Sequence, residues 1–139
     1  EFIMGGEVLF GFKIEFESRR EFITHLGFVD PNVFFEQIDI LVAATNWEEP
    51  FGRTIIESFS YGVPVIASNL GAFSELVNES TGFLIDNKSV QNINQVVGDI
   101  ISGNIDYESL SKNCIEFSER FNSELISEKY LNLLINHEN

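Results

Sequence analysis

Two short apolar runs flank one helical segment in the middle of the chain, and this pattern constrains the fold more than any other feature. Residues 38–44 and 63–67 are rich in β-branched and other apolar side chains, which indicates two buried strands. Between them, residues 51–61 carry Ile55, Ile56 and Phe59 at helical spacing, a face that suits packing on a sheet. Strand, helix and strand in this order predict parallel strands joined by a right-handed crossover.

The start of this helix predicts an anion site. Pro50 disfavours helix at Glu49, so we expect the helix to begin near Phe51. The first N–H groups of a helix have no partner within it, and the positive end of the helix dipole lies there. Gly52 allows close approach to the backbone and Arg53 adds a positive charge, so a phosphate or diphosphate is the expected ligand.

Two carboxylates frame the predicted helix. Glu49 lies just before its N-terminus and Glu57 lies within it, so both border the anion site if the helix lines a cleft. Carboxylates accept hydrogen bonds from hydroxyl groups, which would suit a polyol on each side of a diphosphate. These residues also have explanations that involve no ligand. Surface glutamates usually face water, and Arg53 is equally suited to form a surface ion pair with Glu49 or with Glu57.

The remaining patterns extend the same architecture. Short strands are predicted at residues 21–26 and 83–85, and short helices at residues 33–37 and 73–77. Three amphipathic segments follow, whose apolar stripes we expect to belong to the core: residues 90–102, 107–120 and 123–135. The expected fold class is α/β, with a Rossmann-like parallel sheet sandwiched by helices.

Charge and cysteine content exclude several classes of function. The 22 acidic residues outnumber the 8 basic ones and give a formal charge of −14, which disfavours nucleic-acid binding and attachment to anionic membranes. The single cysteine, Cys114, permits no intrachain disulfide and no cysteine-based metal site, and the two histidines are far apart. The sequence shows neither a membrane-spanning window nor a signal peptide, so we expect a cytoplasmic location.

Several stretches carry a resemblance to a known family. They read Glu-Pro-Phe-Gly-Arg-Thr-Ile-Ile-Glu at residues 49–57, Gly-Val-Pro-Val-Ile-Ala-Ser at residues 62–68 and Gly-Ala-Phe-Ser-Glu at residues 71–75. Together they resemble the donor-binding half of the retaining glycosyltransferases of family 4, which have the GT-B fold. His-Leu-Gly-Phe-Val at residues 25–29 and Thr-Gly-Phe-Leu-Ile at residues 81–85 extend this likeness.

The resemblance implies a site for a nucleoside-diphosphate sugar. It implies that Glu49 contacts the donor sugar near the reacting centre, as the catalytic residue, and that Glu57 accepts hydrogen bonds from the ribose hydroxyls. It further implies that the diphosphate is held at Phe51, Gly52, Arg53 and Thr54, and that the base lies near Gly27, Phe28 and Val29. Catalysis in this family retains the anomeric configuration without a metal, so no metal or other cofactor is expected. Glu75 either opens a helix or lies beside the ligand.

Parts that such enzymes carry are absent from the sequence. The acceptor domain and the opening part of the donor domain are missing, and Arg19 and Arg20 do not stand where a diphosphate-binding basic pair is usual. We therefore expect residues 1–139 to be a single donor-binding domain, either a fragment or a degenerate copy, that binds a nucleotide weakly and is inactive by itself. Its expected partners are a nucleotide-sugar donor and the N-terminal acceptor domain of the same protein.

Residues 1–20 and the function leave alternatives open. Apolar and other residues alternate over residues 8–16, which predicts a strand, whereas the resemblance implies a strand at residues 2–4, a glycine turn and then a helix. An exposed aromatic stretch here would suit a non-catalytic domain that docks a protein partner. A nucleotide-sugar epimerase also shares the GT-B fold, but the histidines and acids expected around its sugar are not apparent.

Overall fold

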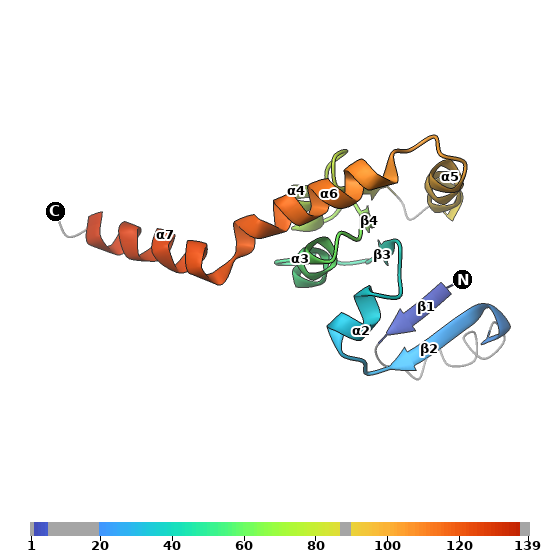
Figure 1. The fold of residues 1–139 in the computed structure, drawn as a ribbon, viewed down its shortest axis with the longest axis horizontal. Coiled ribbons are helices and arrows are strands. Elements are labelled where there is room, and N and C mark those ends of the chain that lie inside the picture. Colours follow the sequence, from blue (N-terminus) through green and yellow to red (C-terminus); the bar gives the residue numbers. More distant parts are fainter. Residues whose placement is uncertain (1, 6–19, 87–89, 137–139) are drawn as a thin grey trace. The chain divides into compact units, whose positions relative to one another are not determined.

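The chain forms two compact units of parallel strands and helices. The computed structural model describes residues 2–5, 20–86 and 90–136 (Figure 1). One unit lies within Glu1–Ile38 and the other within Asp39–Asn139. Both contain only parallel strand pairs among the described residues, which confirms the predicted α/β class.

The first unit is a two-stranded parallel sheet followed by a short helix. β1 (Phe2–Gly5) pairs with β2 (Ile23–Gly27), which the 3-10 helix η2 (Arg20–Phe22) precedes. α2 (Pro31–Phe35) follows, and the Asp30 carboxylate caps it by accepting a hydrogen bond from its backbone.

The strand that the resemblance implied at residues 2–4 is confirmed by β1. The alternating stretch at residues 8–16 lies outside the described residues, so both interpretations of it stay predictions. β2 begins later than the strand predicted at residues 21–26, because η2 occupies the first of those positions. α2 begins earlier than predicted, since Pro31 suits the first position of a helix.

The second unit is built on a three-stranded parallel sheet. β3 (Leu41–Ala43), β4 (Val65–Ser68) and β5 (Gly82–Ile85) lie in this order, with β4 in the centre and all of its residues buried. α3 (Arg53–Ser60) connects β3 to β4, and α4 (Phe73–Leu76) connects β4 to β5. The predicted strand, helix and strand in the middle of the chain are therefore present.

Residues 90–136 are largely helical. They form α5 (Val90–Ile101), α6 (Tyr107–Ser118), the 3-10 helix η3 (Glu119–Phe121) and α7 (Ser123–Asn136). α6 packs against α3, and α5 lies against β5. α7 follows η3 along the chain. Within the described ranges, no helix is both long and apolar enough to cross a membrane.

The core lies between β4 and the helices α3, α4 and α6. Its buried members are Ile55, Phe59, Val65, Ala67, Phe73, Leu76, Val77 and Cys114. Ile55 and Phe59 are fully buried, as predicted for the inner face of α3, whereas Ile56 is only partly buried against the core. The ring of Phe59 meets that of Phe117 edge-on at 5.6 Å between centroids, so α6 is tied to α3 by an aromatic pair.

β3 is shorter than the strand predicted at residues 38–44. The pairing with β4 begins where the Leu41 N–H donates to the Pro64 carbonyl at 3.0 Å and ends at Ala43. Before β3, the Asp39 carbonyl accepts a hydrogen bond from the Tyr107 hydroxyl at 2.9 Å. Apolar composition marks the buried run but does not show where its backbone pairing stops.

The apolar faces of the three C-terminal helices were predicted to belong to the core. Of these helices, α6 buries Leu110 and Cys114. α5 buries no residue completely, and α7 packs mainly on η3. The large apolar side chains that α7 exposes are Leu125, Tyr130, Leu131, Leu133, Leu134 and Ile135. The prediction was wrong for α7 because periodicity shows that a helix has an apolar face, not that another element covers it.

Truncating Phe59 should destabilise the second unit strongly. Phe59→Ala removes a fully buried ring and leaves a cavity, so we expect the free energy of unfolding to fall by about 3–5 kcal/mol. Urea unfolding followed by circular dichroism measures this loss. Tyr130→Ala, at a side chain that is 66% exposed, is the control and should change stability by less than about 0.5 kcal/mol. Similar losses in both variants would contradict this core.

Cys114 should be inert in the folded chain. Its thiol is fully buried and donates to the Thr81 carbonyl at 3.3 Å, and burial raises the pKa of the Cys114 thiol to about 12. We expect no reaction with a thiol reagent at pH 8 until denaturant is added. Because the pKa is raised in the folded state, this group's contribution to stability is full below pH 9 and is lost as the pH rises toward 12. Rapid labelling under native conditions would contradict this placement.

Candidate functional site

The N-terminus of α3 is formed by a glycine in the left-handed conformation. Gly52 has φ +76° and ψ 37°, so the helix begins at Arg53, two residues later than predicted. The Gly52 carbonyl accepts hydrogen bonds from the N–H groups of Ile55 at 3.0 Å and Ile56 at 3.4 Å. The N–H groups of Arg53 and Thr54 precede these and have no partner within the helix, so they are the donors that this helix end offers to an anion. Phe51 lies before the helix, with 56% of its side chain exposed.

Close packing requires the glycine at this position. Gly52 is buried, and a Cβ atom added to it would lie 2.7 Å from Cδ1 of Leu76 and 3.3 Å from Cδ1 of Phe73. Both neighbours belong to α4 and to the core. Helix α4 therefore presses directly on the start of α3, and only a residue without a side chain fits between them.

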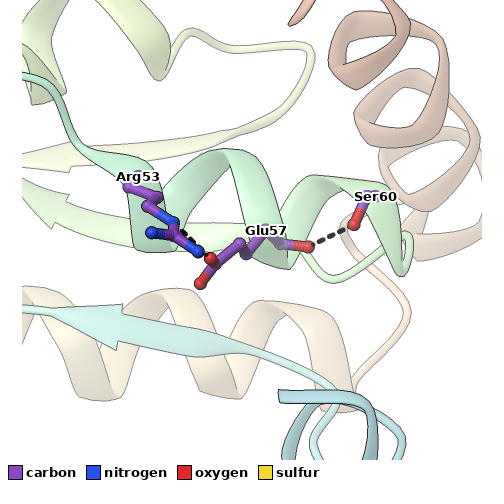
Figure 2. A network of polar contacts seen from close by, with 3 residues as sticks. All are labelled: Arg53, Glu57 and Ser60. Carbon is purple, nitrogen blue, oxygen red and sulfur yellow. Dashed lines mark hydrogen bonds and ion pairs between the residues drawn. The ribbon is translucent and has the colours of Figure 1, made fainter. Parts of the chain in front are cut away.

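Arg53 and Glu57 form an ion pair on the surface of α3 (Figure 2). Nε of Arg53 lies 2.7 Å from Oε1 of Glu57, one helical turn further on. The Arg53 side chain is 83% exposed and that of Glu57 is 31% exposed. The Ser60 hydroxyl donates to the backbone carbonyl of Glu57, not to its carboxylate. The structure thus realises one of the surface pairings that the sequence left open for Arg53.

Glu49 lies in the loop between β3 and α3, and its backbone is held by the next loop along the chain. The Glu49 carbonyl accepts a hydrogen bond from the Ala72 N–H at 2.8 Å. Gly71 has φ +54°, and a Cβ atom added to it would lie 2.6 Å from the Glu49 carbonyl oxygen and 2.7 Å from its nitrogen. The two loops therefore touch backbone to backbone, and the Glu49 side chain is half-buried.

The same loop is attached to β4 at its beginning. The Thr45 N–H donates to Oγ of Ser68 at 3.0 Å, and the Ser68 hydroxyl donates to the Thr45 carbonyl at 3.1 Å. Oγ1 of Thr45 in turn accepts a hydrogen bond from the N–H of Trp47 at 3.3 Å. Ser68 is the last residue of β4, so these contacts lie at the carboxyl edge of the sheet, where α/β proteins bind their ligands.

The three residues predicted to lie near a base belong to the first unit. Gly27 ends β2 with φ +65°, Phe28 exposes 87% of its side chain and Val29 is half-buried. Arg53, Thr54 and Glu57 lie on α3 in the second unit, and Gly52 directly precedes them. Glu75, the additional candidate, is exposed on the four-residue helix α4.

An open hollow of about 740 Å³ lies elsewhere, between β5 and α5. Its described lining includes Phe83, Leu84, Val96 and Asp99, and it contains no predicted site residue. In the part of the chain that the structure describes, no group of three or more His, Cys, Asp or Glu side chains could hold a metal ion. We therefore locate the candidate site at the carboxyl edge of the sheet and not in this hollow.

Ser68 and Gly71 are the residues of this region to which the sequence analysis assigned no role. Both belong to the motifs that carried the family resemblance, at residues 62–68 and 71–75. A buried serine at the end of an apolar strand is a weak signal, because it becomes informative only when its partner is known. That partner, Thr45, is 23 residues away in the sequence.

Comparisons with known proteins converge on one family. The profile of "Glycosyl transferases group 1" matches residues 13–117. Over 86 residues, the chain is 37% identical to the lipopolysaccharide core biosynthesis mannosyltransferase LpsB of Rhizobium meliloti, covering 52% of this chain and 24% of that protein. Over 102 residues, it is 30% identical to the capsular polysaccharide biosynthesis glycosyltransferase CapM of Staphylococcus aureus, covering 72% of this chain and 27% of that protein.

Solved structures give the same result. The Anabaena protein Alr3699/HepE, crystallised in complex with UDP, superposes with a TM-score of 0.86 at 25% identity, covering 96% of this chain and 40% of that one. The same protein in complex with UDP-glucose superposes with a TM-score of 0.82. The predicted relation to one half of a GT-B fold is confirmed by this similarity. The chain spans well under half the length of these relatives.

Adding a methyl group at Gly52 should disturb the start of α3. Gly52→Ala must adopt an unfavourable positive φ and must also push Leu76 and Phe73 aside. Gly103→Ala is the matched control, because Gly103 has the same φ of +76° but no atom within 4 Å of an added Cβ. We expect Gly52→Ala to lower the free energy of unfolding by about 1–3 kcal/mol more than Gly103→Ala in urea titrations. Equal losses would show that α4 does not press on Gly52.

Proposed function

Because this chain belongs to the family of group 1 glycosyl transferases, we propose that it is the donor-binding domain of a retaining glycosyltransferase of family 4. The enzyme would transfer a sugar from a nucleoside-diphosphate sugar to a saccharide or a lipid-linked saccharide. Residues 1–139 would form a single domain that works with the N-terminal acceptor domain of the same protein, in the cytoplasm. The isolated chain would then bind the donor without turning it over.

The observation that carries this proposal is the N-terminus of α3 at the carboxyl edge of a parallel sheet. There the left-handed Gly52 leaves the N–H groups of Arg53 and Thr54 facing outward from the first turn. Support comes from the Anabaena protein, which is 25% identical over most of this chain and was crystallised with UDP and with UDP-glucose. We assign the diphosphate to Gly52, Arg53 and Thr54, together with the backbone at Phe51.

The Arg53–Glu57 ion pair is compatible with donor binding by both residues. Within the described part of the chain, the pair engages Nε of Arg53 and Oε1 of Glu57, so the two terminal guanidinium nitrogens and the second carboxylate oxygen can meet a ligand. An exposed pair with this spacing is worth about 0.3–0.5 kcal/mol, so a ligand can redirect it at little cost. In our proposal Arg53 turns to the diphosphate while Glu57 accepts hydrogen bonds from the ribose hydroxyls.

Glu49 is proposed to act at the donor sugar. Its backbone is fixed against Gly71 and Ala72 in the loop that leads into α3. The family resemblance, and not this backbone geometry, supports a place for its carboxylate on the sugar side of the diphosphate. Positioned N–H groups and Arg53 would stabilise the departing nucleoside diphosphate without a metal ion. Gly27, Phe28 and Val29 are proposed to contact the base, for which the 87% exposed ring of Phe28 offers a surface.

A nucleotide titration of this chain tests the proposal. Amide chemical shifts are followed while UDP, GDP, ADP or CMP is added to concentrations of several millimolar. We expect saturable shifts with one nucleotide, centred on residues 51–54 and 27–29. Glu57→Ala should weaken this binding by about tenfold or more, because a hydrogen bond to a charged group contributes about 1.5–3 kcal/mol.

Glu116→Ala provides the matched control for this variant. Glu116 pairs with Lys112 one turn away on α6, so its removal also deletes one exposed carboxylate from an ion pair on a helix. We expect the affinity for the nucleotide to stay within about twofold of the original. Absence of shifts with every nucleotide, or equal weakening in both variants, would refute the donor site on α3.

A further inference from the structure

The Ser68 side chain replaces the backbone pairing of the sheet at the point where the loop between β3 and α3 begins. β3 pairs with β4 from Leu41 to Ala43, in register with Val65 to Ala67. Beyond Ala43 the chain leaves the sheet, and among the described residues the next hydrogen bonds between the two segments are those of the Ser68 hydroxyl. It accepts a hydrogen bond from the Thr45 N–H and donates one to the Thr45 carbonyl.

Burial makes this contact costly to lose. Ser68 is 2% exposed, and both of its hydrogen bonds are partly buried. Without the hydroxyl, a backbone donor and a backbone acceptor of Thr45 would be left without protein partners beside the buried strand β4. Thr45 also accepts a hydrogen bond from the Trp47 N–H through its own side chain, which extends the polar contacts two residues further along the loop.

The second attachment of the loop comes from the residues that directly follow Ser68. Ala72 donates to the Glu49 carbonyl at 2.8 Å, and Gly71 lies against the Glu49 backbone so closely that no side chain fits between them. The loop is thus held near its start by residue 68 and at Glu49 by residues 71 and 72. These residues form one continuous segment of the chain.

We infer that Ser68 is a positioning residue, which holds the loop between β3 and α3 so that Glu49 stays in place beside the bound donor sugar. Ser68 need not touch the ligand to do this. The inference concerns the placement of Glu49, and its functional part rests on the proposed donor site. Its structural part is that loss of the hydrogen bonds between Ser68 and Thr45 also weakens the hydrogen bond between Ala72 and Glu49.

Hydrogen exchange of the ligand-free chain tests the structural part with Ser68→Ala. The Ala72 amide is the reporter, because it donates its hydrogen bond to the Glu49 carbonyl and not to Ser68. If Ser68 holds the whole loop, the Ala72 amide should exchange about 5- to 10-fold faster in the variant, as expected for the loss of roughly one hydrogen bond's net contribution. An unchanged rate at Ala72 would overturn the inference.

Ser58→Ala is the matched control. Ser58 is fully buried in α3, and its hydroxyl donates to the Val63 carbonyl at 2.8 Å, so this variant also loses a buried serine hydrogen bond in the same unit. We expect the Ala72 amide to exchange within about twofold of the original rate in Ser58→Ala. Equal acceleration in both variants would mean general loosening of the fold and would overturn the inference.

The unaltered chain supplies a measurement that does not depend on the folding of Ser68→Ala. If one loop carries both contacts, a single opening motion should expose the amides of Thr45 and Ala72 to exchange. The two amides should then have similar protection against hydrogen exchange, and urea should change their exchange rates in the same way. Separate opening of the two amides would overturn the inference.

Ligand binding then tests the functional part, with UDP and UDP-glucose as probes. In Ser68→Ala, we expect binding of UDP-glucose to weaken by about tenfold and binding of UDP by less than about twofold, because only the sugar would meet Glu49. Equal weakening of both ligands would overturn the assignment to Glu49. If the unaltered chain binds neither ligand, the proposed donor site fails, while the exchange rates still decide whether Ser68 holds the loop.

Discussion

The packing of α3 on β4 is the contact on which the rest of the second unit depends. Ile55 and Phe59 of α3 and Val65 and Ala67 of β4 are fully buried in one cluster, and burial of each large apolar side chain stabilises by about 1.5–3 kcal/mol. This contact sets the direction of the helix relative to the strand. The N-terminus of α3 consequently lies at the carboxyl edge of the sheet, where parallel α/β folds place their ligands.

The loop that leads into α3 is held by polar and backbone contacts instead of apolar packing. Ser68 binds the backbone of Thr45, and the Gly71 segment lies against the backbone of Glu49. By contrast, the Arg53–Glu57 pair at the end of this loop is exposed and weakly held. The scaffold of the candidate site is therefore firmly attached, while the charged groups that would meet a ligand remain free to change partners.

Much of the fold could be predicted from local patterns. Apolar periodicity and turn residues located β4, α4, β5 and α5 to within a residue or two. The start of α3 was misplaced because Gly52 adopts a left-handed conformation and therefore precedes the helix. A Cβ atom at this position would also be crowded by Leu76 and Phe73. The residues of the candidate site could be predicted from the order of the motifs along the sequence. The ion pair of Arg53 with Glu57 could not, because the sequence also allowed Arg53 to pair with Glu49.

The sequence by itself determined the order of strands and helices, the buried face of α3 and the family to which the chain belongs. These properties depend on spacing and residue type over a few neighbours, which a linear pattern records. Tertiary structure alone decided that Ser68 binds Thr45, that Gly71 meets Glu49 and that the apolar face of α7 stays exposed. The reason is physical: a hydrogen bond or a steric contact depends on distance in space, and the fold brings together residues that lie many positions apart in the chain.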